Sequence, residues 1–326
     1  MLDENISDRE KYSVGALLYS PANSRKIIKQ IRLGKIPPPY SAALCLEDSV
    51  ADSAVSYAEE CVIDTLKETA EIKKSEDVYI PPFFVRVRNP GQITGIYNSA
   101  GEYAELIKGF ILPKYVPECA EDYNRAIIEV NAHADRKIYM MPILESDEII
   151  SVRTRTEKLF ELKNIIDGMR EYVLNVRVGG NDFCRIYGLR RNFSQTIYDI
   201  GVVNACLMDI LNIFSCDYVV SAPVWEYFDT KSDDNWKTGL ENEIRKDILN
   251  GFIGKTAIHP SQVPVINNML KVTRQDYEDA CSVAEWNNME YGVNKIGKRM
   301  NEVKCHRKWA QKILAFADIY GIREDI

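Results

Sequence analysis

The chain has 326 residues, of which 46% are hydrophobic and 27% are charged, with a formal net charge of −7 at pH 7. These fractions are typical of a globular protein with a large core. The negative charge and the lack of an arm rich in Lys and Arg argue against a nucleic-acid partner. No uninterrupted apolar run approaches roughly 18 residues, so we expect no membrane span. The polar, acidic start MLDENISDREKYS is unlike a secretory or transit signal, which favours a cytoplasmic protein.

The eight cysteines are scattered, and they include no Cys-x-x-Cys pair and no neighbouring histidine cluster. Disulfide frameworks and zinc sites both need local spacing patterns of such residues. We therefore expect free thiols in a reducing compartment.

Short apolar, β-branched runs alternate with longer amphipathic stretches along the chain. The predicted strands are 14–22, 42–48, 83–89, 109–115, 137–146, 172–182, 217–223 and 254–260. Strands that alternate with helices predict parallel βαβ units, and eight such units favour a closed (β/α)8 TIM barrel over an open sheet. We assign residues 1–270 to the barrel and 271–326 to a C-terminal helical arm or lid. The arm is expected to hold helices near 275–292 and 304–321 and no strand of its own.

Polar residues end most of the predicted strands. They are Glu47 and Asp48, Arg86 and Arg88, Lys114, Glu145, Asp182, Ser221 and His259. In barrels of this type the reaction site lies at the carboxyl ends of the strands, so these side chains are expected to converge.

Glu145 and Asp182 end two strands with strong β patterns. Two converging carboxylates repel each other unless a cation or a proton lies between them, and a hard divalent ion such as Mg²⁺ or Mn²⁺ fits that requirement. The alternative is that each carboxylate caps the helix that follows. The Gly179-Gly180 pair would let the backbone approach a ligand.

Arg86 and Arg88 alternate with valines, so both are expected on the same face of the third strand. An arginine at the top of the barrel interior can bind a substrate carboxylate through two hydrogen bonds. The alternative is a salt bridge to a neighbouring strand-end carboxylate such as Glu47.

Lys114 occupies a strand end where the Schiff-base lysine of a metal-free aldolase could lie. Only three histidines are present, which argues against a three-histidine zinc site. For His259, a structural hydrogen bond and a catalytic role are equally compatible with the pattern. No glycine-rich dinucleotide or phosphate-loop motif occurs.

Seven segments together resemble a known family: LLYSPANSRK, LCLEDSVADSAVSYAEE, FVRVRN, FILPK, PILES, VGGNDF and GKTAIHPSQV. Their order and spacing, from about residue 14 to 320, are similar to those of the citrate lyase beta-subunit and malyl-CoA lyase group of the HpcH/HpaI aldolase superfamily. Within it, the chain most resembles the TIM-barrel C–C bond lyase branch of tellurite-resistance-type gene clusters.

This resemblance implies a lyase or aldolase dependent on Mg²⁺ (or Mn²⁺). The substrate would be a small keto or hydroxy acid or its CoA thioester, cleaved through a metal-stabilised enolate. The family's metal ligands fall on Glu145 and Asp182, and its carboxylate-binding arginine falls on Arg86. Its acidic pair falls on Glu47 and Asp48, near the metal and its waters.

The sequence also departs from the family pattern. Cys45 replaces an aspartate before the LEDS motif, the Pro-Gly that follows LES is absent, and Asn181 replaces a glutamate. We expect Gly180 and Asn181 to contribute to substrate binding. Relatives that use CoA carry a catalytic aspartate in an arm contributed by a neighbouring subunit, and Glu302 lies nearest that position. The resemblance implies a homo-oligomer, a trimer or a hexamer. The departures leave open a second hypothesis, a catalytically altered barrel that serves as a binding or assembly component of a biosynthetic pathway.

Overall fold

The computed structural model describes residues 7–229, 234–286, 293–296 and 299–324. Its centre is an eight-stranded sheet of parallel neighbours in the order β7-β6-β5-β4-β3-β2-β1-β8. The strands are β1 (Ala16–Pro21), β2 (Ser41–Cys45), β3 (Phe83–Arg86), β4 (Ile107–Leu112), β5 (Tyr139–Leu144), β6 (Val176–Val178), β7 (Val220–Ser221) and β8 (Lys255–Ala257). Each overlaps one of the eight runs that the sequence predicts, although β2 begins one residue and β4 two residues before the predicted start.

The sheet closes on itself where its two end strands meet. Ala222, directly after β7, forms a parallel bridge with Lys255 of β8. The amide of Ile253 donates to the carbonyl of Val220 at 2.9 Å on the same seam. A closed ring of eight parallel strands confirms the predicted (β/α)8 barrel.

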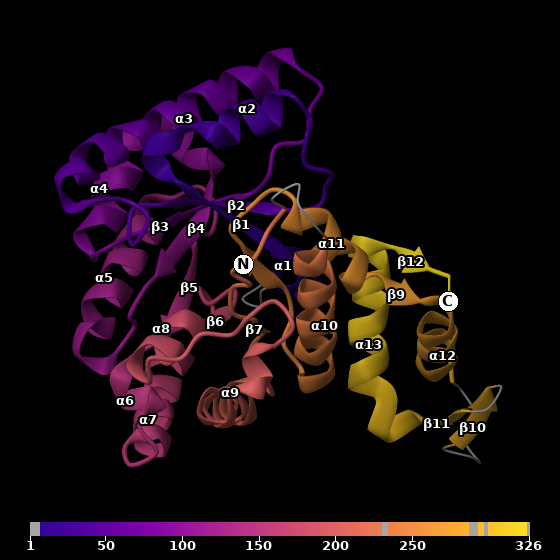
Figure 1. Ribbon diagram of the computed structural model, residues 1–326. Helices are drawn as coiled ribbons and strands as arrows, with labels where there is room; N and C mark the ends of the chain where they lie inside the picture. Colours follow the sequence, from indigo (N-terminus) through magenta and orange to yellow (C-terminus); the bar gives the residue numbers. More distant parts are fainter. Residues whose placement is uncertain (1–6, 230–233, 287–292, 297–298, 325–326) are drawn as a thin grey trace.

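Helices cover the outside of this ring (Figure 1). They are α2 (Lys26–Arg32), α3 (Val55–Ser75), α4 (Gly91–Ala100), α5 (Pro117–His133), α6 (Asp147–Ile150), α7 (Arg155–Asp167), α8 (Gly180–Ile186), α9 (Gly201–Phe214), α10 (Asn235–Asn250) and α11 (Gln262–Leu270), while α1 (Asp8–Ser13) precedes β1. In α3 the buried residues Ala58, Val62 and Leu66 recur every four positions, which places them on the face toward the barrel. Among the described residues, no helix is both long and apolar enough to cross a membrane.

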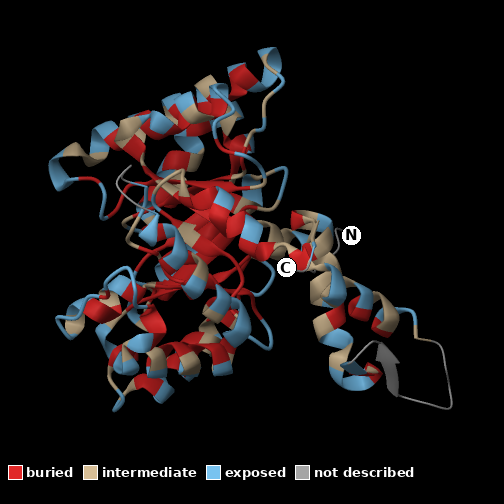
Figure 2. Cartoon of the chain, turned by 45° about the vertical axis from the view of Figure 1, so that its right-hand side comes forward, coloured by how far each residue is buried: buried red, intermediate tan, exposed pale blue. Residues whose placement is uncertain are grey.

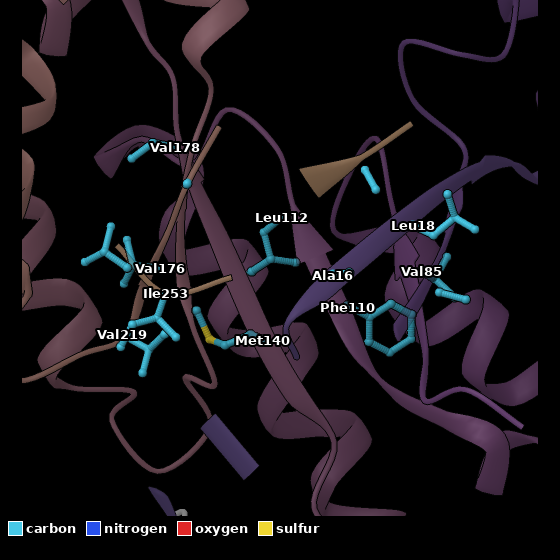
Figure 3. Packing of buried hydrophobic residues seen from close by; sticks show 14 of the residues in the cluster. Ala16, Leu18, Val85, Phe110, Leu112, Met140, Val176, Val178, Val219 and Ile253 are labelled. Atoms are coloured by element: carbon cyan, nitrogen blue, oxygen red, sulfur yellow. The ribbon is translucent and has the colours of Figure 1, made fainter. Parts of the chain in front are cut away.

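Strand residues alternate between two buried layers, because successive side chains of a strand point to opposite faces. In β3, Phe83 and Val85 join the layer between the strands and the helices, part of which Figure 3 shows. Phe84 joins a separate cluster formed by strand residues and their immediate neighbours, which is the interior of the barrel. Arg86 has the same parity as Phe84 and therefore projects into the barrel at its carboxyl end.

The segment after α11 forms an arm at one side of the barrel, and fewer of its residues are buried (Figure 2). It contains α12 (Arg274–Ala284) and α13 (Val303–Tyr320), with β9 (Val272–Thr273) paired to β12 (Ile322–Arg323) and β10 (Val293–Ile296) paired to β11 (Arg299–Glu302). Tyr12 fixes α13 to the barrel, since its ring stacks on Phe316 at 5.3 Å and its carbonyl accepts from the Tyr320 hydroxyl.

Two expectations for the arm were wrong. It does contain strands, and its first helix ends at Ala284; residues 287–292, where that helix was expected to finish, lie outside the described residues. Two residues, one of them Gly297, separate β10 from β11. Such a short glycine-containing connection between two four-residue segments is a hairpin signal.

Candidate active site

Arg86, the last residue of β3, joins the ends of three strands. Its Nη2 lies 2.7 Å from Glu47 Oε2 and 3.7 Å from Glu145 Oε1, and its Nη1 lies 3.1 Å from Asp48 Oδ2. Arg86, Glu47 and Glu145 are only 7%, 7% and 4% exposed. The structure therefore brings together four of the residues that the sequence singled out, at the carboxyl ends of β2, β3 and β5.

Arg88 contacts the loop after β2 rather than the buried carboxyl groups that Arg86 contacts. Its guanidinium donates to the carbonyl oxygens of Leu46, Glu47 and Val50 and forms an ion pair with Asp52. These contacts fix the loop between β2 and α3. They hold the Glu47 backbone in place, so Arg88 shapes the site through that loop.

Lys114 connects two of the carboxylates. Its ammonium lies 2.8 Å from Glu47 Oε1, and its backbone amide donates to Glu145 Oε1 at 2.8 Å. The amide is turned there by a left-handed backbone conformation, φ 48°, which is uncommon outside glycine. The hydrogen bond to Glu47 raises the pKa of Lys114, against a smaller effect of burial. A lysine held in its charged form is a poor Schiff-base nucleophile at neutral pH, so this geometry does not favour the metal-free aldolase.

Glu145 is the carboxylate with the most unusual surroundings. Burial raises its pKa to about 8, and the charge of Asp182 adds to that increase while Arg86 opposes it. At neutral pH the Glu145 carboxyl group is therefore mainly protonated when no metal ion is bound. Burial also acts to raise the pKa of Asp48, but its hydrogen bond with Glu47 and the charges of Arg86 and Lys114 outweigh it, and that pKa is lowered.

The two glycines after β6 make room for neighbouring side chains. A Cβ at Gly179 would lie 2.4 Å from both Cβ and Oε2 of Glu145, and one at Gly180 would lie 2.7 Å from Cβ of Pro223. Asn181 is exposed and Asp182 partly buried in the first turn of α8. In that position Asp182 both benefits from the positive end of the helix and faces Glu145 closely enough to affect its pKa.

Oxygen donors at this end of the barrel fit a hard divalent cation. Within the described ranges, no group of three or more His, Cys, Asp and Glu residues has the arrangement of a complete metal site. Mg²⁺ is often held by only one or two carboxylates, with waters and substrate completing its shell. Glu145 and Asp182 are two carboxylates that could hold such an ion. A cavity of about 670 Å³, lined in part by Glu47, Asp48 and Lys114, opens at the ends of β2 and β4.

The structure does not bring Glu302 to the mouth of the barrel, which is formed by the carboxyl ends of its strands. It ends β11 in the arm, where its backbone amide donates to His306 Nδ1 at 3.0 Å. Figure 1 shows β11 far from the ends of β2, β3 and β5. His259 has structural contacts, because its Nδ1 lies 2.8 Å from Ser261 Oγ and its ring stacks on Phe228 at 4.8 Å.

Sequence reasoning did not identify a buried ion network behind β8. Lys255, 1% exposed, lies 2.9 Å from Glu243 and 2.8 Å from Asp247, both on α10, and Arg191 reaches Glu243 at 3.0 Å. The lysine of the GKTAIHP segment thus fixes α10 against the barrel. A lysine inside an apolar strand was the available signal, but its distant partners were not predictable.

Tyr19 and Arg177 were also missed. Tyr19 projects from β1 into the barrel mouth, where the Arg86 guanidinium lies 5.7 Å from its ring centre. Arg177 lies in β6 between two valines and is 2% exposed. A charged residue in the middle of an apolar strand is the signal that could have marked it.

The solved structures similar to this chain include citrate lyase-type proteins. A citrate lyase from Burkholderia xenovorans aligns with a TM-score of 0.72 and 14% identity, over 100% of this chain and 96% of its own. The CitE protein of Mycobacterium tuberculosis, in complex with magnesium, acetoacetate and coenzyme A, aligns with a TM-score of 0.61 and 19% identity, over 94% and 99%. The citrate lyase beta subunit of the same organism, complexed with oxaloacetate and magnesium, gives 0.51 and 18%, over 80% and 98%. At these identities the likeness establishes the fold.

No curated protein matches this chain. The family model described as C–C bond lyase of the TIM-barrel fold matches residues 8–322, which is nearly the whole sequence. The chain therefore belongs to the family of C–C bond lyases of the TIM-barrel fold.

Proposed function

We propose that this protein is a Mg²⁺- or Mn²⁺-dependent lyase or aldolase that acts on a small keto or hydroxy acid or on its CoA thioester. The observation that carries the proposal is the convergence of Glu47, Asp48, Glu145 and Arg86 at the mouth of one barrel. Asp182 affects the pKa of Glu145 from the start of α8.

In this proposal Glu145 and Asp182 hold the metal ion. When bound, the ion supplies positive charge that stabilises the enolate developing as the carbon–carbon bond breaks. Lys114 and Arg86 orient Glu47, which lies within 2.8 Å of both. Glu47 and Asp48 are thereby fixed as acceptors for water or substrate hydroxyl groups. Gly180 and the exposed Asn181 line the approach to Asp182 and are proposed to contact the substrate.

The ligands of two structural relatives support the choice of substrate class. CitE of Mycobacterium tuberculosis is in complex with acetoacetate and coenzyme A, and the beta subunit from that organism is complexed with oxaloacetate. Both hold magnesium. A keto acid is the chemistry shared by acetoacetate and oxaloacetate, and it matches a mouth that combines carboxylates with Arg86.

The proposal is tested with purified protein in two measurements. Mn²⁺ binding is followed by calorimetry, and carbon–carbon cleavage is assayed with a panel of keto acids, hydroxy acids and their CoA thioesters. We expect Glu145→Gln and Asp182→Asn each to weaken Mn²⁺ binding at least tenfold and to lose turnover, because each removes a ligand charge. Asp147→Asn, which changes an exposed carboxylate beside the same strand end, is the matched control. Unchanged Mn²⁺ affinity in both variants would contradict the assignment of Glu145 and Asp182 as metal ligands.

The assay also separates the enzyme from a barrel that only binds or assembles. Metal binding without turnover of any substrate in the panel would favour the binding component. Glu302 is tested in the same assay together with the oligomeric state, measured by light scattering. A catalytic role for Glu302 requires a neighbouring copy to bring its arm to this mouth, so a monomer in solution with full activity would exclude that role.

A further inference from the structure

Arg177 is a buried cation without a carboxylate partner. It is 2% exposed, and its Nη2 donates to Thr256 Oγ1 at 2.7 Å. Its Nη1 is buried and has no hydrogen-bond partner within the described part of the chain. An arginine cannot shed its charge in a protein, so an unpaired guanidinium in the barrel carries a large desolvation penalty.

The other buried cations show how unusual this is. Arg86, Arg155, Arg191 and Lys255 are all less than 9% exposed. Each has a carboxylate oxygen within 3.0 Å, and for Arg177 the described residues provide none within 4.0 Å. Every other buried cation of the described ranges therefore has a counter-ion, and Arg177 is left with uncompensated positive charge.

Strand register places Arg177 directly beneath the mouth. It pairs with Ile143 of β5, two residues before Glu145, and so lies one inward layer below that carboxylate. Its partner Thr256 pairs with Leu17 of β1, two residues before Tyr19. Tyr19 thus lies one layer above the guanidinium, and the two side chains interact electrostatically.

Tyr19 lies between this charge and Arg86, whose guanidinium is 5.7 Å from the centre of the Tyr19 ring. It is partly buried, whereas Arg177 is almost fully buried. Above it, Arg86 is already engaged by Glu47, Asp48 and Glu145. Lys114 is paired with Glu47 in the same way. Among the described cations at these strand ends, Arg177 is therefore the one without a carboxylate partner, and we assign its action to the neighbouring Tyr19 hydroxyl.

We propose that Tyr19 contacts the substrate at the floor of the mouth, and that Arg177 beneath it is a positioning residue whose unpaired charge makes this contact selective for a carboxylate group. The inference rests on the proposed function only in assigning the substrate to this mouth. It assigns recognition of the anion to residues other than Arg86, whose charge is already engaged, and it explains why a costly unpaired cation is present in the barrel.

The first test measures stability and needs neither metal nor substrate. Arg177→Met removes an uncompensated buried charge with a side chain of similar length, so we expect the Tm to rise or stay unchanged. Arg191→Met is the matched control, because it removes an equally buried arginine that is paired with Glu243, and we expect it to lower the Tm. An equal loss of Tm in both variants would show that Arg177 is a structural residue and would overturn the proposal.

The second test compares pyruvate with its uncharged methyl ester as calorimetric probes, with and without Mg²⁺. Wild-type protein should bind pyruvate more tightly than the ester. Tyr19→Phe, which removes only the hydroxyl, should weaken pyruvate binding about tenfold or more, in line with the loss of a hydrogen bond to a charged group. Arg177→Met should abolish the preference for the anion, and Arg177→Lys should restore part of it.

The outcomes separate this inference from the proposed function. If wild-type protein does not distinguish pyruvate from the ester, or if the Tyr19 and Arg177 variants keep the full preference, the inference is wrong, even where lyase activity is found. If the preference depends on Arg177 while no substrate is cleaved, the inference stands and the lyase assignment fails.

Discussion

The Arg86 guanidinium lies 2.7 Å from the carboxylate of Glu47, and the side chains of both residues are less than one-tenth exposed. The same guanidinium lies 3.7 Å from Glu145. A single buried cation thus contacts two buried carboxyl groups, which follow β2 and β5. Removing it leaves the buried negative charge of Glu47 with little solvent to stabilise it, which makes Arg86 important for stability as well as for any chemistry.

We therefore expect Arg86→Met to lower the free energy of unfolding by about 3 kcal/mol or more, the usual cost of breaking a buried ion pair. Urea unfolding at pH 7 measures the change. Arg125→Met is the control, because Arg125 is 67% exposed and pairs with Glu121 and Asp122 on the surface of α5. It should change stability by less than about 0.5 kcal/mol. Equal losses in the free energy of unfolding for Arg86→Met and Arg125→Met would mean that Arg86 and its carboxyl partners are solvated.

The raised pKa of Glu145 predicts a pH dependence of stability. Burial raises that pKa from 4.5 to about 8 in the folded protein, so the folded chain retains a proton that the unfolded chain loses near pH 4.5. Stability without metal should therefore fall as pH increases from about 4.5 to 8. Thermal unfolding in the presence of a chelator measures this, and Glu145→Gln should flatten the profile.

Metal binding should show the opposite trend. A cation held by Glu145 must displace the proton, so Mn²⁺ affinity should increase up to tenfold for each pH unit between 6 and 8. Close to one proton should be released per ion at pH 7. Calorimetry in two buffers with different ionisation enthalpies measures the release. Affinity that is independent of pH across this range would contradict the assignment of Glu145 as a ligand.

Gly179 is predicted to be essential for the position of Glu145. A Cβ at residue 179 would lie 2.4 Å from Glu145 Oε2, so Gly179→Ala must displace the carboxylate or the strand end. We expect a loss of at least tenfold in Mn²⁺ affinity and a lower Tm. Gly201→Ala at the start of α9 is the control, since no atom lies within 4 Å of its Cβ position, and it should leave both quantities unchanged or slightly raise the Tm.

The ion network behind β8 gives a prediction about stability alone. Lys255→Met leaves Asp247 and part of Glu243 without their buried cation, and we expect a loss of about 3 kcal/mol in the free energy of unfolding. Lys246→Met is the control, because Lys246 is 43% exposed and pairs with Asp199 at the surface. Metal affinity should be unchanged in both variants when it is measured below their Tm. A specific loss of metal binding in Lys255→Met would show that this network also supports the mouth.

Much of the barrel could be predicted because its signals are local. Each strand is a short apolar run, and the polar residues that end the runs, such as Glu47 and Glu145, must meet once the strands are parallel and closed. The same reasoning failed in the arm, where β10 and β11 lack an apolar alternation and depend on their mutual pairing. It also could not separate the roles of Arg86 and Arg88. Both were expected on one face of the third strand, but β3 ends at Arg86, and Arg88 lies beyond it and contacts the loop after β2.

The sequence by itself determined the order of the barrel's strands and helices and the charged groups that end its strands, because hydrophobic periodicity and strand ends are read residue by residue. Tertiary structure alone decided which charges neutralise one another. Arg86 meets carboxylates from β2 and β5, Lys255 meets two from α10, and Arg177 meets none among the described residues. Such pairings depend on distances across a closed ring between residues far apart in the chain, and those distances are set only when the last strand joins the first.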